Sequence, residues 1–123
     1  MPAPVVLVHD DPMFLRTAET AFRNAGIEPA TFNSSLVALE AVEQAKNVRV
    51  LVTRDNFNAP GDPNGASLVL VARRSVPDLK AVFVCSDGTE ALAADYGASL
   101  NQSAAPAEIV KSVQELLASD VNF

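Results

Sequence analysis

The sequence is poor in the residues from which disulfides, metal clusters and membrane spans are built. It has one cysteine, Cys85, and one histidine, His9, which excludes an internal disulfide and a zinc-type ligand cluster. No stretch approaches the roughly 18 consecutive apolar residues of a membrane span. The N-terminus lacks the basic start and the small-residue cleavage site of a signal peptide. We therefore expect a cytoplasmic protein that has no contact with membranes.

Basic side chains are also scarce. The chain has 9 Lys and Arg against 15 Asp and Glu, which gives a net charge of -6, and no basic stripe offsets this excess. A negative protein repels the phosphate backbone. We expect no binding to nucleic acid.

Two signatures of enzymes and cofactor modules are missing. The segment HDDP at 9–12 offers no glycine-rich or hydroxyl-rich loop for a nucleotide or a flavin. A hydrolase could combine Ser86, His9 and Asp55, but the G-x-S-x-G turn that aims a serine is absent. We keep a small hydrolase as a disfavoured alternative and expect that the chain is not an enzyme.

The chain does contain an alternation of apolar runs and helical patterns from end to end. Its 123 residues, 49% of them hydrophobic, suit a single domain over 1–123. The pattern predicts strands at 4–9, 27–32, 48–53, 81–85 and 99–101, and helices at 11–24, 35–46, 65–75, 87–97 and 106–117. The apolar helical positions are predicted to be core, among them Leu36, Leu39, Val42, Leu68, Val69, Leu70, Ile109, Val113, Leu116 and Leu117.

The strands differ in a way that predicts their order. Those at 4–9, 48–53 and 81–85 are nearly continuous apolar runs, as expected of strands covered on both faces. The strand at 27–32 contains Pro29 and the last strand is short and polar, so both are expected at the edges. We predict an α/β fold of the flavodoxin-like, doubly wound kind, with a five-stranded parallel sheet in the order 2-1-3-4-5 and helices on both faces.

In this arrangement ligands bind beyond the carboxyl ends of the first and third strands, where the winding direction reverses. The residues expected there are His9, Asp10, Asp11, Thr53, Arg54 and Asp55. Adjacent carboxylates at the mouth of a parallel sheet are typical ligands of Mg²⁺. Asp11 with Pro12 is also a helix start, and His9 alone reads as a plain strand-end residue.

The segment VLVHDDP at 6–12 resembles the opening of the response regulator receiver family, in which two acidic residues after the first strand hold Mg²⁺. The resemblance continues through PGDPNG at 60–65, PDLK at 77–80 and PAEI at 106–109, and it covers essentially the whole chain. It implies a receiver-like domain in phosphorelay, or two-component, signal transduction.

The resemblance also implies roles for individual residues. Asp10 and Asp11 match the metal-binding pair, whereas a gap-free match places Arg54 on the phosphoacceptor position and Asp55 one residue beyond it. Cys85, followed by Ser86, replaces the hydroxyl that senses the phosphoryl group, and Gln102 replaces the lysine.

These replacements predict a stand-alone degenerate receiver, or pseudo-receiver, in which phosphoryl acceptance is impaired or lost. Because Arg54 competes for Asp10 and Asp11, we expect any Mg²⁺ binding to be weak or lost. The domain would act through protein contacts, with a histidine kinase or a downstream signalling protein as partner, and a homodimer stays open. The alternative is a functional receiver that is phosphorylated on the displaced Asp55.

Overall fold

A computed structural model describes residues 5–9, 11–45, 48–54, 65–85, 97–101 and 105–121. Within these ranges the chain forms β1 (Val5–Val8), α1 (Pro12–Asn24), β2 (Ala30–Phe32), α2 (Ser35–Ala45), β3 (Val50–Arg54), α3 (Gly65–Ser75), β4 (Lys80–Cys85), β5 (Gly97–Asn101) and α4 (Pro106–Val121). The predicted helix at 87–97 lies outside the described residues, apart from Gly97, which begins β5.

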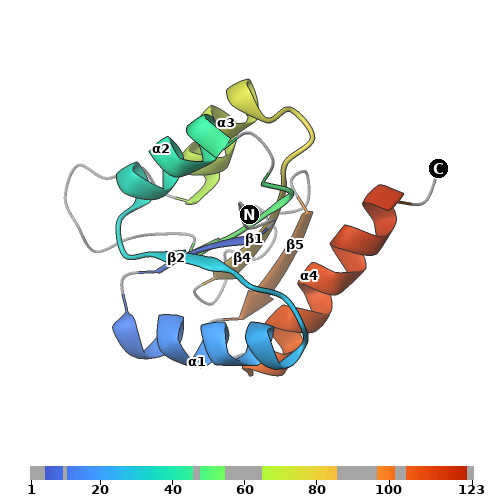
Figure 1. The fold of residues 1–123 in the computed structure, drawn as a ribbon. Helices are drawn as coiled ribbons and strands as arrows, with labels where there is room; N and C mark the ends of the chain where they lie inside the picture. The colour runs from blue at the N-terminus through green and yellow to red at the C-terminus, as the bar shows by residue number, and fades with distance from the viewer. Residues whose placement is uncertain are drawn as a thin grey trace.

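The strands pair in parallel in the order β2-β1-β3-β4-β5 (Figure 1), which confirms the predicted flavodoxin-like sheet. Every residue of β1 is buried, as are all residues of β3 except the half-buried Arg54. Strands β2 and β5 lie at the two edges as predicted, although β5 begins at Gly97, two residues before the predicted start at 99. The buried, apolar strands β1 and β3 therefore lie inside the sheet, with the half-buried β2 at one edge.

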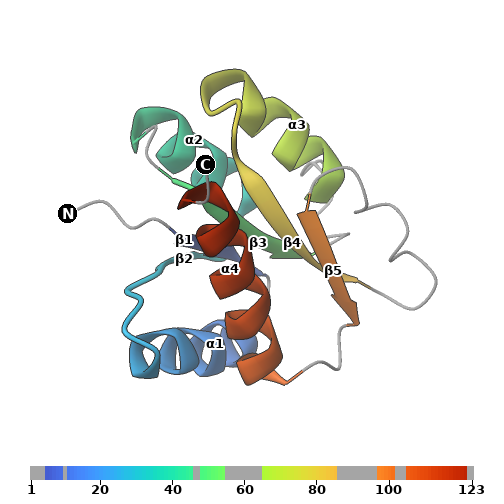
Figure 2. The same ribbon diagram turned by 90° about the vertical axis from the view of Figure 1, so that its right-hand side faces the viewer.

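Helices cover both faces of the sheet, as predicted. In Figures 1 and 2, α2 and α3 lie side by side over one face, and α1 and α4 lie over the other. Among the described residues, no helix combines the length and the apolar character that crossing a membrane would need.

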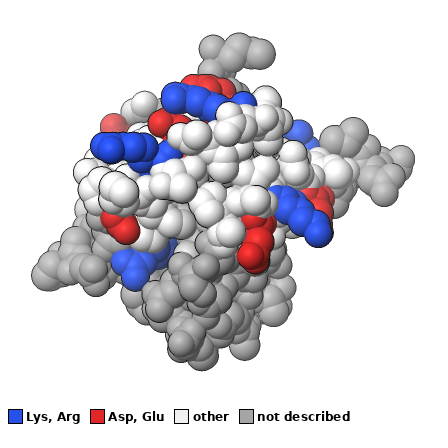
Figure 3. All heavy atoms as spheres, turned by 90° about the horizontal axis from the view of Figure 1, so that it is seen from below, with Lys and Arg blue, Asp and Glu red and all other residues white. Residues whose placement is uncertain are grey.

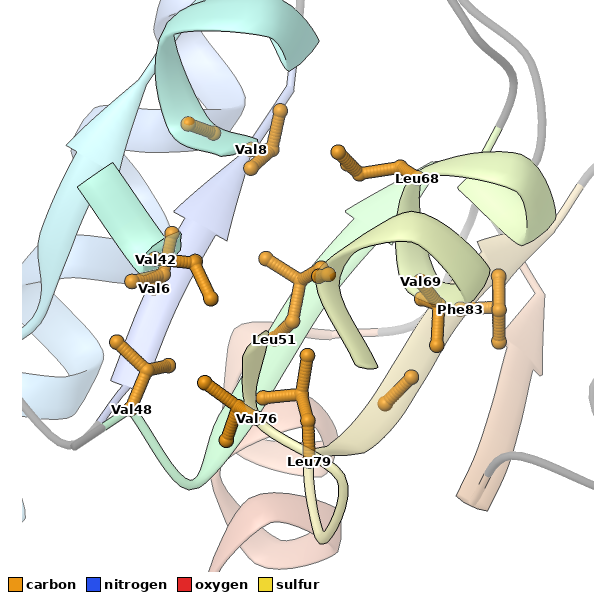
Figure 4. Packing of buried hydrophobic residues seen from close by; sticks show 13 residues of the cluster. Val6, Val8, Val42, Val48, Leu51, Leu68, Val69, Val76, Leu79 and Phe83 are labelled. Atoms are coloured by element: carbon orange, nitrogen blue, oxygen red, sulfur yellow. The ribbon is translucent and has the colours of Figure 1, made fainter. Parts of the chain in front are cut away.

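The sheet separates two hydrophobic clusters, because successive side chains of a strand point to opposite faces. Val6 and Val8 of β1 pack under α2 and α3 (Figure 4), whereas Val5 and Leu7 pack against α1 and α4. The first cluster also contains Ala38, Val42, Val48, Leu51, Leu68, Val69, Ala72, Val76, Leu79, Ala81 and Phe83. The second also contains Ala18, Phe22, Val50, Val52, Val82, Val84, Ile109, Val110 and Val113.

Strand β2 begins at Ala30, three residues later than the sequence predicts. The predicted start belongs instead to the end of α1, where Gly26 has a φ of 83°. The Gly26 amide donates to the Arg23 carbonyl (3.0 Å) and the Ile27 amide to the Phe22 carbonyl (2.9 Å). This pattern closes the helix in the way that a glycine in the left-handed region allows. Pro29 follows, and because it has no amide hydrogen it stays outside the ladder.

The predicted helical core is wrong at two positions. Leu36 and Leu70 are 53% and 52% exposed. In α2 the residues that face the sheet are Ser35, Ala38 and Val42, and this stripe leaves Leu36 on the outer surface. The final helix agrees better with its prediction, since Ile109 and Val113 are buried and Leu116 and Leu117 pack against the same cluster.

A side chain from the beginning of the third strand reaches the last helix. Arg49 precedes β3, and its Nη2 donates to the carbonyl of Leu117 in α4 at 2.9 Å. The two residues are 68 positions apart in the sequence. This contact ties α4 to the centre of the sheet.

The start of α2 provides a test of the core. Ser35 is fully buried, and its hydroxyl has no hydrogen-bond partner among the residues that the structure describes, whereas the Ser34 Oγ accepts from the Val37 amide at 3.5 Å. An unsatisfied buried hydroxyl is costly, so we expect Ser35→Ala to leave the free energy of unfolding unchanged or to raise it by about 1 kcal/mol. The neighbouring Ser34→Ala should lower it by about 0.5–1 kcal/mol, because it removes a helix cap. Urea unfolding followed by circular dichroism measures both changes. A clear loss of stability in Ser35→Ala would contradict the conclusion that the buried Ser35 hydroxyl is unsatisfied.

Candidate functional site

The candidate site lies at the carboxyl edge of the sheet, where the parallel strands end. Val8 of β1 pairs with Thr53 of β3, so His9 and Arg54 are the next residues of the two chains. Arg54 in turn pairs with Val84 of β4, and Cys85 is the last residue of that strand. The structure therefore places the backbones of four predicted site residues, His9, Thr53, Arg54 and Cys85, at one edge.

Four other predicted residues lie outside the described residues. These are Asp10, Asp55, Ser86 and Gln102. Their predicted roles, the metal pair, the displaced phosphoacceptor and the switch positions, stay predictions. Asp10 is the residue between His9 and Asp11, and Asp55 is the residue after β3.

The turn between β1 and α1 is held by a series of hydrogen bonds. The His9 amide donates to the Phe32 carbonyl of β2 at 3.1 Å, and the Asp11 amide donates to Nδ1 of His9 at 2.9 Å. The Asp11 Oδ1 then accepts from the Met13 amide at 3.0 Å, which makes Asp11 the N-cap of α1 as predicted. These hydrogen bonds fix the backbone at His9 and at Asp11, the residues before and after Asp10.

His9 has a larger part in this turn than the sequence suggests. The residue is 8% exposed, and its ring stacks on Phe14, with ring centroids 4.0 Å apart and an angle of 21° between the planes. A ring nitrogen that accepts from an amide carries no proton, so this geometry requires the Nδ1-unprotonated ring. The signal in the sequence is weak, because only Phe14, five residues later, hints at a partner for the ring.

Arg54 brings a permanent positive charge to the same edge. Its side chain is half-buried, and the neighbouring Thr53 is fully buried, with Oγ1 3.2 Å from the Arg54 carbonyl that accepts its hydrogen bond. A guanidinium has five hydrogen-bond donors, has no acceptor and stays charged. It can bind carboxylates or phosphate, but it cannot accept a phosphoryl group or coordinate a metal.

The described residues of this edge are a poor set of ligands for Mg²⁺. They supply one carboxylate, Asp11, which is already engaged as a helix cap, and one cation, Arg54. Within the described ranges, no group of three or more histidine, cysteine and acidic residues could hold a metal ion. A magnesium site would require Asp10 and Asp55, which the structure does not describe.

Comparison with solved structures finds the same arrangement of strands and helices in response regulator receiver domains. A receiver protein from Sinorhizobium medicae superposes with a TM-score of 0.81 at 22% identity, covering 93% of each chain. A receiver domain from Clostridium thermocellum gives 0.81 at 16% identity over 94% of each chain. A CheY-like receiver domain from Methanospirillum hungatei gives 0.76 at 18% identity, over 94% of this chain and 93% of the other.

The chain has the receiver fold. This agrees with the resemblance seen in the sequence, and it covers nearly the whole chain. Comparisons with protein-family models and with curated proteins give no match. At these identities the receiver domains establish the fold, and function has to be argued from the residues at the carboxyl edge.

The His9 contacts lead to a prediction about stability. His9→Val places an apolar side chain after β1 but removes both the acceptor for the Asp11 amide and the ring that stacks on Phe14, so we expect the free energy of unfolding to fall by about 1–2 kcal/mol. His9→Asn offers an acceptor oxygen and should recover part of that loss. Urea unfolding of the three proteins measures the difference. Equal stability of His9→Val and the native protein would mean that the Nδ1 contact and the ring stacking together contribute nothing.

Proposed function

We propose that this chain is a degenerate receiver, a signalling domain that acts through protein contacts and has impaired or lost phosphoryl acceptance. The observation that carries the proposal is the end of β3 at Arg54, in register with the end of β1. In the receiver family the third strand ends in the aspartate that accepts the phosphoryl group. This register supports the gap-free match, in which an arginine stands at that position.

The positive charge of Arg54 opposes the binding of Mg²⁺, which receiver chemistry needs. Replacing a carboxylate by a guanidinium changes the local charge by two units, at the edge where a Mg²⁺ ion would have to bind. Each pair of like unit charges about 5 Å apart costs on the order of 3 kcal/mol at an effective dielectric constant of about 20. This repulsion is large enough to lower metal affinity by more than tenfold. The side chain therefore favours a site in which a fixed cation replaces the metal.

The predicted switch residues also argue against a phosphorylation-driven change. Cys85 ends β4, where the family has a hydroxyl that bonds the phosphoryl group, and Gln102 offers a neutral amide in place of an ammonium. A thiol is a weak hydrogen-bond donor. A ligand shifts a conformational equilibrium only by its differential affinity for the two states. If Cys85 and Gln102 bind the phosphoryl group only weakly, phosphorylation would therefore shift the equilibrium little.

The surface of the described residues supports a role in protein binding. Figure 3, seen from the side of α1, shows a broad area without charged side chains, with side chains of both signs along parts of its border. Protein interfaces are typically depleted of charged residues at their centre and polar at their rim. We therefore propose a histidine kinase or a downstream signalling protein as the partner, with no enzymatic activity of the domain itself.

The first test concerns the metal. The native protein should bind Mg²⁺ weakly, and Arg54→Asp should bind it at least about tenfold more tightly, because it removes a repelling charge and adds a ligand. Arg54→Ala, which only removes the charge, should lie between the two. Isothermal titration calorimetry at low protein concentration gives the affinities. Arg74→Asp carries the same change of charge on the exposed surface of α3 and should bind like the native protein. Tight binding of Mg²⁺ by the native protein would refute the proposal.

The second test concerns the switch. A small phosphodonor such as acetyl phosphate, added with Mg²⁺, should leave the amide NMR signals of residues 85–104 essentially unchanged. The reason is that Cys85 and Gln102 replace the hydroxyl and the lysine that bind the phosphoryl group in the family. Large shifts in this region that disappear in Asp55→Asn would identify a working receiver phosphorylated on the displaced aspartate. That result would establish the alternative function instead.

A further inference from the structure

The layer formed by α2 and α3 exposes apolar side chains that the core does not use. Among the described residues, four large hydrophobic side chains are more than half exposed, and three of them, Leu36, Val37 and Leu70, lie on these two helices. The fourth, Met13, is on α1, which covers the other face of the sheet (Figures 1 and 2). Because three of the four are on one pair of helices, this side of the molecule is a candidate contact site.

The two helices carry charges of opposite sign. The charged residues of α2 are Glu40 and Glu43, and those of α3 are Arg73 and Arg74. Within each helix an exposed leucine is followed four residues later by an exposed charge, Leu36 by Glu40 and Leu70 by Arg74. Residues four apart lie on the same side of a helix. Each helix therefore shows an apolar residue beside a charge, and the charges of the two helices are complementary.

We propose that this α2–α3 face binds a second copy of the chain in a two-fold symmetric dimer, with α2 of each copy lying against α3 of the other. This goes beyond the proposed function, because it uses no residue of the carboxyl edge. In a two-fold dimer every contact occurs twice. In the proposed dimer Glu40 of each copy meets Arg74 of the other, and the exposed leucines are covered between the two copies.

The charges also select the direction of the symmetry axis. Both helices return from the same edge of a parallel sheet, so they run side by side in the same direction. An axis parallel to the helices places α2 over α3, whereas an axis across them places α2 over α2 and brings Glu40 and Glu43 against their own copies. Like charges at close range are destabilising. Only the first arrangement pairs opposite charges.

The expected dimer is weak. Two short helices bury a small area, and the net charge of -6 on each copy opposes association. We expect a dissociation constant on the order of 0.1–1 mM, typical of a transient contact. Sedimentation velocity of the full chain between low micromolar and millimolar concentration should show a shift from monomer to dimer.

A charge exchange identifies the contact. Glu40→Arg and Arg74→Glu should each weaken self-association by about fivefold to tenfold, because attraction becomes repulsion in two places. An equimolar mixture of the two variants should recover dimerisation, since Glu40 and Arg74 then meet opposite charges on the other copy. This recovery is specific to two copies of this chain in the proposed arrangement.

Two further variants keep the result independent of folding. Leu36→Ser with Leu70→Ser should abolish the dimer while the circular dichroism spectrum is retained, and Met13→Ser, the matched change on the other face, should leave self-association unchanged. Three results would each overturn the proposal: a native chain that stays monomeric at 1 mM, a mixture that fails to recover dimerisation, or an equal effect of Met13→Ser. A monomeric native chain would mean that a different partner, or none, covers this face.

Discussion

The pairing of β1 with β3 is the constraint on which the other features depend. Val5 to Val8 run beside Val50 to Thr53 in parallel and in register, and these residues are buried from both faces. A slip of one residue would move each apolar side chain to the opposite face, so burial fixes the register. The same register decides which residues lie at the carboxyl edge. Because Val8 pairs with Thr53, the next residues of the two strands, His9 and Arg54, lie beside each other. Core packing and the chemistry of the site are thus set by a single alignment of two strands.

The order of the strands could be predicted from the sequence because it depends on bulk properties. Continuous apolar runs can only be satisfied between two layers of helices, and a proline or a polar strand is tolerated only at an edge. The finer features depend on contacts that no local pattern reveals. The beginning of β2 differs from the prediction because residues 26 and 27 close α1. Leu36 and Leu70 are predicted as core because the identity of an apolar residue does not show which face of the helix it occupies.

The candidate site was predictable in position but less so in its chemistry. The topology alone indicates the ends of β1 and β3 as the place for a ligand. His9, in contrast, looked unremarkable in the sequence, although its ring accepts the Asp11 amide and stacks on Phe14. Such a role depends on the distance between a ring and a backbone amide, which follows from the turn and not from the identity of neighbouring residues. The identity of the residue at the end of β3 likewise depends on where the strand stops, which a sequence pattern leaves uncertain by one or two positions.

The contact between Arg49 and the Leu117 carbonyl has a consequence for recognition. It joins α4 to Arg49, the residue before the central strand β3. Sliding α4 along the sheet would therefore break a charge-assisted hydrogen bond that is partly buried. A surface held in this way meets a partner in its final shape and loses little conformational entropy on binding. In the degenerate receiver that we propose, such a face would present one fixed shape, and signalling would then depend on how much of the protein is present and on which partners are available to bind it.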